Sequence, residues 1–296
     1  MSTISRHVKD LEARLGLTLC RRGRGGFVLT PEGAQVYAAI ERLLGATASF
    51  RSQLNDIQHR MVGDLHIALF EKTASNPASR IAQALGAFRE LAPKVSLHLH
   101  VGAIGMIERG VMDGRFGLGI IPEHRRSESL LYDELFDETM QLYAGKGHAW
   151  FVGADRQDWR SLRRQDLAGL GYHSPNLELA HRRKLDRAAS ASDQEAVATL
   201  VLSGGYVGFL PDHYAEPFVR AQRMRVVAPN RLSYSCRFSC IHRHSPAPSR
   251  IARAFRECLI EAHAGNAGPA PSKTGNSKSS VTKSGATSSG AAGPGA

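Results

Sequence analysis

The sequence has 296 residues, a formal net charge of +11 and four cysteines. This length suits one small module plus a body of one or two domains, with enough chain to bury hydrophobic cores. The cysteines form no CxxC pair and the chain begins with no apolar signal segment, which fits a reducing cytoplasm better than secretion. No apolar run approaches the length of a membrane span, and the positive charge favours an acidic partner such as nucleic acid.

The first predicted element is an amphipathic helix over residues 2–15. Its apolar residues recur at helical spacing and share one face: Ile4, Val8, Leu11 and Leu15. The opposite face is short, polar and basic, as a helix that enters the major groove of DNA requires. The candidate DNA-binding residues of this helix are Ser2, Thr3, Ser5, Arg6 and Lys9. On this pattern alone an ordinary solvated surface helix is the better interpretation.

A basic hairpin is predicted next. An apolar strand from Leu17 leads into a turn with three glycines, and a second strand covers residues 27–29. The turn adds Arg21, Arg22 and Arg24 to the candidate DNA-binding residues, because forked guanidinium donors suit phosphate oxygens. A helix followed by a basic hairpin is typical of a winged DNA-binding module.

A long helix is predicted from Pro31 to about His59. Thr30 is the expected N-cap and Pro31 the first helical residue. The apolar spacing along this helix resembles a dimerisation seam, although Arg51 and Gln58 interrupt it. The seam residues are Tyr37, Ile40, Leu44, Thr47, Leu54, Ile57 and Met61.

After Gly63 strands alternate with helices, which predicts an α/β body with parallel strands and crossover helices. In its first unit the predicted strands are 64–70, 95–101 and 116–122; the helices are one that Asn76-Pro77 begins and Leu91 ends, and a short one over 106–112. The second unit begins near residue 137 and contains the stretch 169–174, a helix after Ser192 and a strand over 206–211. Ser192 and Glu195 have capping-box spacing, Gly204-Gly205 end that helix, and a last helix covers Ser249–Ala262.

Together these elements resemble a LysR-type transcriptional regulator over residues 2 to about 262. The matching stretches are TISRHVKDLEARLG, LTLCRRGRGGFVLTPEG, DLHIALF with AFRELAPKVSLHLHVG, and ATLVLSGGYVGFLP. Members of this family begin with two further helices, which end in a serine-glutamine pair before the residue that matches Ser2. We therefore expect either a start codon assigned too far downstream or a truncated chain.

The resemblance implies a domain organisation. An α/β chain is expected, with a partial winged helix-turn-helix (1–30), a linker and dimerisation helix (31–61) and a two-lobed effector domain (62–262) that resembles periplasmic binding proteins. Lobe one is expected over about 62–137 and 247–262, and lobe two over about 138–246. From residue 263 to residue 296 the chain is rich in Gly, Ala, Ser, Pro and Lys, which predicts a disordered tail.

The resemblance also places a small-molecule effector in a cleft between the lobes. Helix N-termini near Asn76 and Ser192 are expected to offer N–H groups and a positive dipole end to an anionic effector. The candidate effector-binding residues are Thr73, Ser75, Asn76, Gly102, Pro122, Tyr172, His173, Ser174 and Ser192. Capping alone would also explain Thr73, Ser75 and Ser192.

Other groupings in the sequence do not amount to a site. Two histidine pairs alternate along strands, but a closed zinc centre takes four ligands; the pairs are His98 with His100 and His242 with His244. Cys236 and Cys240 lie too far apart along a strand for an easy disulfide. Residues 203–208 lack a nucleotide-binding motif, and no serine, histidine and carboxylate occur in a nucleophile-elbow context. No metal, cofactor or enzymatic activity is predicted.

The sequence thus predicts a cytoplasmic LysR-type transcription factor. Its expected partners are double-stranded promoter DNA, a small-molecule effector and further copies of the chain in a homodimer or homotetramer, with RNA polymerase as an additional candidate. The alternative is a small-molecule binding protein without DNA-binding function, because the DNA-binding module starts at Met1 and lacks its first helices. A third hypothesis, an enzyme, has no catalytic constellation to support it.

Overall fold

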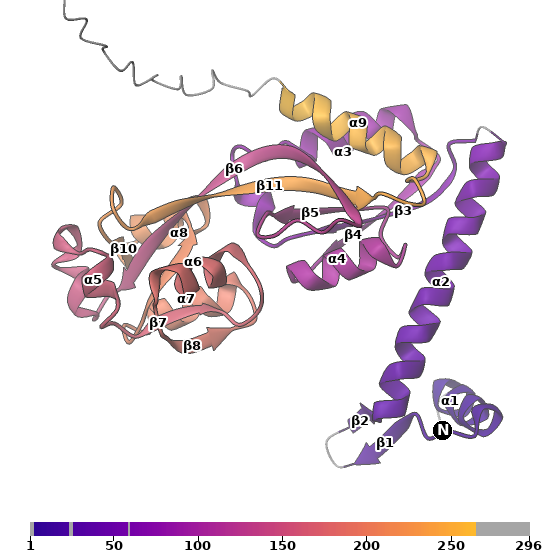
Figure 1. Ribbon diagram of the computed structural model, residues 1–296, viewed down its shortest axis with the longest axis horizontal. Helices are drawn as coiled ribbons and strands as arrows, with labels where there is room; N and C mark the ends of the chain where they lie inside the picture. The colour runs from indigo at the N-terminus through magenta and orange to yellow at the C-terminus, as the bar shows by residue number, and fades with distance from the viewer. Residues whose placement is uncertain (1–2, 24–25, 59, 265–296) are drawn as a thin grey trace, which may run out of the picture. The chain divides into compact units, whose positions relative to one another are not determined.

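The computed structural model describes residues 3–23, 26–58 and 60–264 of the chain (Figure 1). Two predicted DNA-binding residues, Ser2 and Arg24, lie outside these ranges, as does the chain from residue 265 onward. The sequence predicts that the tail begins at residue 263, but the last helix continues through Ala264.

The N-terminal part has the predicted order of helix, hairpin and long helix. Its elements are α1 (Thr3–Leu15), β1 (Cys20–Gly23), β2 (Gly26–Leu29) and α2 (Pro31–Ile57). The first strand begins later than predicted because Leu17 N–H donates to the Glu12 carbonyl oxygen at 3.2 Å, which folds residues 17–19 back on α1. The long helix also ends earlier, at Ile57.

Thr30 is the N-cap of α2, as predicted. Its hydroxyl oxygen accepts the Gly33 N–H at 2.9 Å, and its hydroxyl group donates to the Thr18 carbonyl oxygen at 2.6 Å. A single buried side chain therefore starts the helix and fixes the segment before the hairpin.

Residues 63–264 form an α/β body on one mixed sheet. Among the described residues nine strands join this sheet in the order β4-β3-β5-β11-β6-β9-β7-β8, with β10 paired to β6. The strands are β3 (Gly63–Leu69), β4 (Val95–Val101), β5 (Leu118–Pro122), β6 (Leu130–Gly145), β7 (Leu167–Leu170), β8 (Arg187–Ala191), β9 (Val207–Pro211), β10 (Met224–Val226) and β11 (Ser233–Arg243). Strand β3 is parallel to β4 and β5, and β7 is parallel to β8 and β9, which confirms the predicted crossover architecture.

The body has two lobes that share two long strands. Antiparallel β6 and β11 run through both lobes, with Leu130 opposite Arg243 at one end and Gln141 opposite Ser233 at the other. Lobe one adds α3 (Ile81–Leu91), α4 (Ile104–Met112) and α9 (Arg250–Ala264), and lobe two adds α5 (Trp159–Leu162), α6 (Pro175–Arg183), α7 (Gln194–Leu202) and α8 (Asp212–Arg220). Short 3-10 helices cover Thr73–Ser75 (η1), Ala149–Phe151 (η2) and Ala154–Arg156 (η3).

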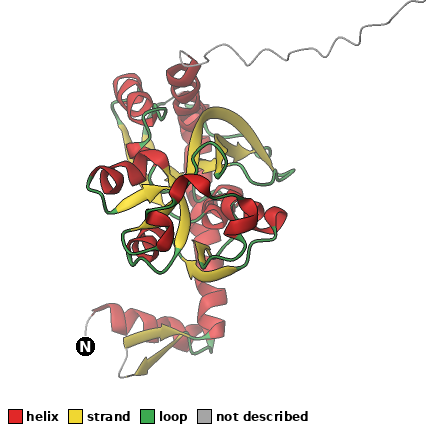
Figure 2. Ribbon diagram, turned by 90° about the vertical axis from the view of Figure 1, so that its left-hand side faces the viewer, coloured by secondary structure: helices red, strands yellow, loops and turns green. Residues whose placement is uncertain are grey.

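Helices cover both faces of the sheet, which explains why some strands are apolar throughout. In lobe one α3 and α9 lie together on one face and α4 lies on the other (Figure 1). The view turned by 90° shows helices around the strands of the body (Figure 2). The rings of Phe88 and Phe255 join α3 to α9 edge to face, with centroids 5.4 Å apart. All residues of β5 and β9 are buried, as expected for parallel strands covered on both sides.

Two predicted helix starts are wrong. Asn76 does not begin α3, because its Oδ1 accepts the Ala78 N–H at 2.9 Å and closes a turn, so that the helix begins only at Ile81. Ser192 does not cap α7 either. The N-cap is Asp193, whose Oδ1 accepts the Ala196 N–H at 2.8 Å.

Candidate functional site

The exposed cations of α1 and β1 form the candidate nucleic-acid surface. Thr3, Arg6, Lys9 and Arg21 are exposed and Ser5 is half-buried. The Arg22 side chain, like Ser2 and Arg24, lies outside what the structure describes. Exposed cations suit phosphate contacts, because they neutralise the nucleic-acid backbone without first being desolvated.

One carboxylate holds this helix and the hairpin together. The Glu12 Oε1 accepts the backbone N–H groups of Leu19 at 2.7 Å and Cys20 at 3.1 Å. The first basic residue of β1 follows directly, so the hydrogen bonds fix the hairpin relative to the polar face of α1. The apolar stripe of α1 is accessible in this chain: Ile4 is 75% exposed, and none of the residues of α1 is buried.

The predicted seam on α2 is exposed along the helix. The side chains of Tyr37, Ile40, Leu44, Leu54 and Ile57 are all accessible. Met61 does not continue the seam, because it lies beyond the helix and packs against the hydrophobic core of the body. A row of large apolar side chains on a polar helix is what a helix-helix interface requires.

Two adjoining cavities form the cleft between the lobes. Pro122 and Ser174 line the first cavity, and Gly102, Tyr172 and Ser192 line the second, which has a volume of about 440 Å³. The cavities adjoin because Phe70 and Gln194 line the first, while their chain neighbours Glu71 and Asp193 line the second. Five of the nine predicted effector-binding residues are thus brought to one cleft from both lobes.

The other four predicted effector-binding residues lie close by. Thr73 is buried within η1, and the Asn76 Nδ2 donates to the Glu138 Oε1 at 3.4 Å. The Ser75 hydroxyl contacts the ring of His213 in lobe two. The ring centroid of His173 lies 6.1 Å from that of His124.

A chain of hydrogen bonds joins the two lobes through His213. Its Nδ1 lies 2.9 Å from the Ser75 Oγ, and its Nε2 lies 2.9 Å from the Glu138 Oε1. The Ser75 hydroxyl donates to the Lys72 carbonyl oxygen at 3.1 Å, so its oxygen is left to accept from the ring. Both nitrogens of the His213 ring therefore have a polar partner, one on η1 of lobe one and one on the shared strand β6.

The N-terminus of α7 is occupied by carboxylates of the protein itself. The Glu71 Oε1 accepts the Gln194 N–H at 2.8 Å, next to the cap that Asp193 makes. Burial raises the pKa of Glu71 to about 7, while the hydrogen bond from Gln194 acts in the opposite direction. The positive end of the helix dipole is therefore already matched by two acidic side chains.

The cation of the larger cavity is also engaged. The Lys72 Nζ lies 2.8 Å from the Glu195 Oε2 and 4.2 Å from the centroid of the Tyr214 ring, and the Tyr214 hydroxyl donates to the same carboxylate at 2.7 Å. Lys72 is the residue before η1, and Glu195 belongs to α7. This ion pair therefore joins lobe one to lobe two at the wall of the larger cavity.

The sequence pattern does not reveal several polar groups in and beside the cleft. Glu138 and Gln194 are buried, and Glu71, Asp193 and His213 are half-buried. Glu71 follows a predicted strand directly, and the carboxyl end of a strand in an α/β sheet is where ligands bind, so its position gave a usable signal. Glu138 and His213 gave none, because their contact depends on the antiparallel pairing of β6 with β9.

Within the described ranges no group of three or more His, Cys, Asp or Glu side chains could hold a metal ion. The rings of His66 and His98 stack with centroids 4.4 Å apart, and the His98 Nε2 lies 2.9 Å from the Asp64 Oδ1. Cys236 and Cys240 are buried free thiols. Among the helices that the structure describes, none is long and apolar enough to cross a membrane.

Two family models together match nearly the whole chain up to residue 264. The model of the bacterial regulatory helix-turn-helix protein, lysR family, matches residues 1–34, and that of the LysR substrate binding domain matches residues 58–264. The HTH-type transcriptional activator BauR of Pseudomonas aeruginosa is 37% identical over 87% of this chain and 85% of its own length. The HTH-type transcriptional regulator EstR of Acinetobacter baylyi is 26% identical over 71% of this chain and 70% of its own length.

Solved structures share the fold. CbnR, a LysR family transcriptional regulator, superposes with a TM-score of 0.59 at 18% identity, over 88% of this chain and 89% of that one. The effector binding domain of QuiR in complex with shikimate superposes with a TM-score of 0.59 at 11% identity, over 69% of this chain and 99% of that one.

Proposed function

Because the chain belongs to the LysR family of transcriptional regulators, we propose that it binds promoter DNA through α1 and the hairpin and responds to a small molecule in the cleft. The observation that carries this proposal is the presence in one chain of an exposed basic helix and hairpin, an exposed apolar seam and a two-lobed body with a cleft. We propose a regulator and no enzymatic role, acting in the cytoplasm.

The proposed DNA-binding residues are those of the first thirty positions: Ser2, Thr3, Ser5, Arg6, Lys9, Arg21, Arg22 and Arg24. Hydroxyls and basic side chains of α1 are suited to base edges, and arginines of the hairpin to phosphates. The seam on α2 supports assembly into a homodimer or a larger homo-oligomer, since its apolar side chains are exposed in the single chain. For the parts of the chain we propose the bounds 1–30, 31–61 and 62–264.

The proposed effector site is the cleft, with the nine predicted residues at or next to it. A ligand that binds one arrangement of the lobes more tightly than another shifts the population toward that arrangement. The contacts that differ between arrangements would be those across the cleft, such as Lys72 with Glu195 and Ser75 with His213. The ligand thereby controls how the DNA-binding modules of an oligomer are presented to the promoter.

A fluorescence anisotropy titration of the chain with the DNA upstream of its own coding sequence tests this function. We expect Arg6→Ala and Lys9→Ala to weaken specific binding, and Arg22→Ala and Arg24→Ala to weaken specific and unrelated DNA alike, each roughly tenfold. Arg253→Ala, an exposed arginine on α9, is the matched control and should change nothing. Equal affinity in all four variants and the control would refute the assignment and leave a small-molecule binding protein.

A further inference from the structure

The side chains that line the larger cavity are mostly acidic. Its charged residues are Glu71, Lys72, Asp193 and Glu195. Lys72 is already paired with Glu195, which leaves Glu71 and Asp193 without a cationic partner among these four. The buried Glu138 adds a further carboxylate in the adjoining cavity, where the His213 Nε2 lies 2.9 Å from its Oε1. A ligand that enters this cleft meets a surplus of negative charge.

Side chains of the protein already accept backbone N–H groups at the two helix starts beside this cleft, those of α6 and α7. At α6 the Ser174 hydroxyl oxygen accepts the Leu177 N–H at 3.3 Å. The Gln194 N–H is accepted by Glu71 and the Ala196 N–H by Asp193, so the protein's own carboxylates hold two of the donors that an anion would seek. A ligand carboxylate would have to displace them and would be repelled by both. The anionic effector expected from the sequence rested on these donors being available.

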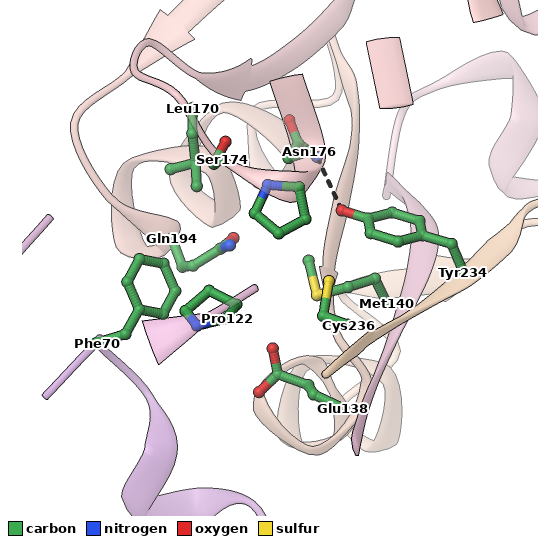
Figure 3. Close-up of a pocket in the computed structure, with 11 residues that line it drawn as sticks. Phe70, Pro122, Glu138, Met140, Leu170, Ser174, Asn176, Gln194, Tyr234 and Cys236 are labelled. Atoms are coloured by element: carbon green, nitrogen blue, oxygen red, sulfur yellow. Dashed lines mark hydrogen bonds between the residues drawn. The ribbon is translucent and has the colours of Figure 1, made fainter. Parts of the chain in front are cut away.

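A buried acceptor in the smaller cavity points independently to a ligand that donates hydrogen bonds. Gln194 is only 3% exposed, yet its Oε1 has no hydrogen-bond partner within the described part of the protein. Figure 3 shows the Gln194 amide and the Glu138 carboxylate turned toward the space that the other side chains surround. A buried acceptor without a donor raises the free energy of the folded state, so a ligand that donates a hydrogen bond to this oxygen would be favoured.

The size of the smaller cavity fits the head of such a ligand. Its free volume is about 10 Å³, which is close to the room that one water molecule needs. An ammonium group is of similar size and carries three donors and no acceptor. The rest of a ligand would then lie in the larger cavity, which has about 440 Å³.

We propose that the effector of this cleft carries an ammonium or similar organic cation, with Glu138 and the Gln194 Oε1 accepting from the cationic head and Glu71 as a second counter-charge. The inference rests on the proposed effector function of the cleft and names the chemistry of its ligand. It applies to an amine in general, whatever groups the remainder of the molecule bears.

Ligand-observed NMR titrations of the full chain test the sign of the charge. The probes are butylammonium chloride and sodium butyrate, which match in length and are compared at equal ionic strength. We expect butylammonium to bind at least tenfold more tightly than butyrate. Tighter or equal binding of butyrate overturns the inference, and so does the absence of binding by either probe.

Variants then locate the cation. The titrations are run at pH 8, above the pKa of about 7 of Glu71. Glu138→Gln and Glu71→Gln should then each weaken butylammonium binding at least tenfold, whereas Glu90→Gln on the exposed face of α3 should leave it unchanged. Gln194→Leu keeps the approximate size of the side chain and removes its amide, including the unpartnered Oε1, so it should weaken binding without loss of the thermal unfolding midpoint. Retained affinity in Glu71→Gln, Glu138→Gln and Gln194→Leu alike would refute the site.

DNA binding by the same preparations separates this inference from the function on which it rests. If the anisotropy titration shows specific DNA binding while butyrate is the preferred probe, the charge assignment fails and the regulator stands. If specific DNA binding is absent, the proposed function fails, whichever probe binds the cleft.

Discussion

The DNA-binding module and the effector cleft differ in the charge of their binding groups, in the exposure of these groups and in the number of chain segments that supply them. The module presents exposed cations from one short stretch of chain, residues 3–23. The cleft collects carboxylates and a histidine from four distant segments, and Glu138 and His213 have side chains only 4% and 6% exposed. A polyanion can be bound by a local surface pattern, whereas a small ligand needs an enclosed set of groups that only the tertiary fold assembles.

The difference in exposure determines how the loss of a side chain affects the stability of the folded state. Exposed cations are already solvated and gain little from one another, so their removal changes binding and hardly affects folding. Buried polar groups have given up their water and depend on their partners, so the loss of one partner affects the folded state itself. The two regions should therefore respond differently to the loss of a charge.

The largest expected effect on stability is at Glu138. In Glu138→Ala the buried His213 and Asn76 lose a shared partner, and we expect the free energy of unfolding to fall by about 2 kcal/mol or more. Arg6→Ala and Lys9→Ala should stay within about 0.5 kcal/mol of the parent. Urea unfolding followed by circular dichroism measures all three.

The exposed pair of Glu216 with Arg220 supplies the control for that comparison. Their side chains are 62% and 76% exposed, so Glu216→Ala should cost about 0.5 kcal/mol or less. Equal losses in Glu138→Ala and Glu216→Ala would show that the contacts of Glu138 do not stabilise the fold.

The next effect is a pH dependence that belongs to the cleft. Burial raises the pKa of Glu71 from 4.5 to about 7, against the hydrogen bond from Gln194 and the charge of Lys72 and together with the charges of Asp193 and Glu138. The folded state therefore holds this proton more tightly than the unfolded state. Its contribution to stability is complete below about pH 4.5 and is lost as the pH rises through about 7.

Glu71→Gln removes that dependence because the amide does not titrate. The thermal unfolding midpoint of the variant minus that of the parent chain should be larger at pH 8 than at pH 5, by a few degrees at most. Differential scanning fluorimetry at the two pH values measures this difference, and Glu90→Gln serves as the control. A difference that is the same at both pH values would contradict the assigned pKa.

The fold was largely predictable because its signals are local. The apolar stripe of α1, the Thr30-Pro31 start of α2 and the apolar runs that became β5 and β9 are each readable over a few residues. The wrong predictions concern helix starts, where either of two nearby polar residues could act as the N-cap. Asn76 has the residue type of a cap, but its own side chain closes a turn before the helix can begin.

The position of the cleft was predictable from the sequence, but its charge was not. Resemblance and strand ends pointed to the loops around Ser75, Gly102 and Tyr172, which do meet there. The charge of the cleft was expected from helix N-termini alone. That expectation could not include Glu71, whose carboxylate reaches the N-terminus of α7 across 123 residues of sequence.

The smallest effect tests which of two adjacent residues caps α7. Asp193 accepts the Ala196 N–H at 2.8 Å, while the Ser192 hydroxyl donates to the Asp193 Oδ2 at 3.1 Å. Asp193→Ala should therefore lower the free energy of unfolding by about 1 kcal/mol, and Ser192→Ala by a few tenths, in urea titrations. Asp193→Asn keeps the accepting oxygen without the charge, so it should recover most of the loss and separate the cap from the electrostatics of the cleft. A larger loss of unfolding free energy for Ser192→Ala than for Asp193→Ala would mean that Ser192 is the cap, as the sequence pattern predicts. The Ala196 N–H would then not be held by Asp193 and would be available to an anionic ligand.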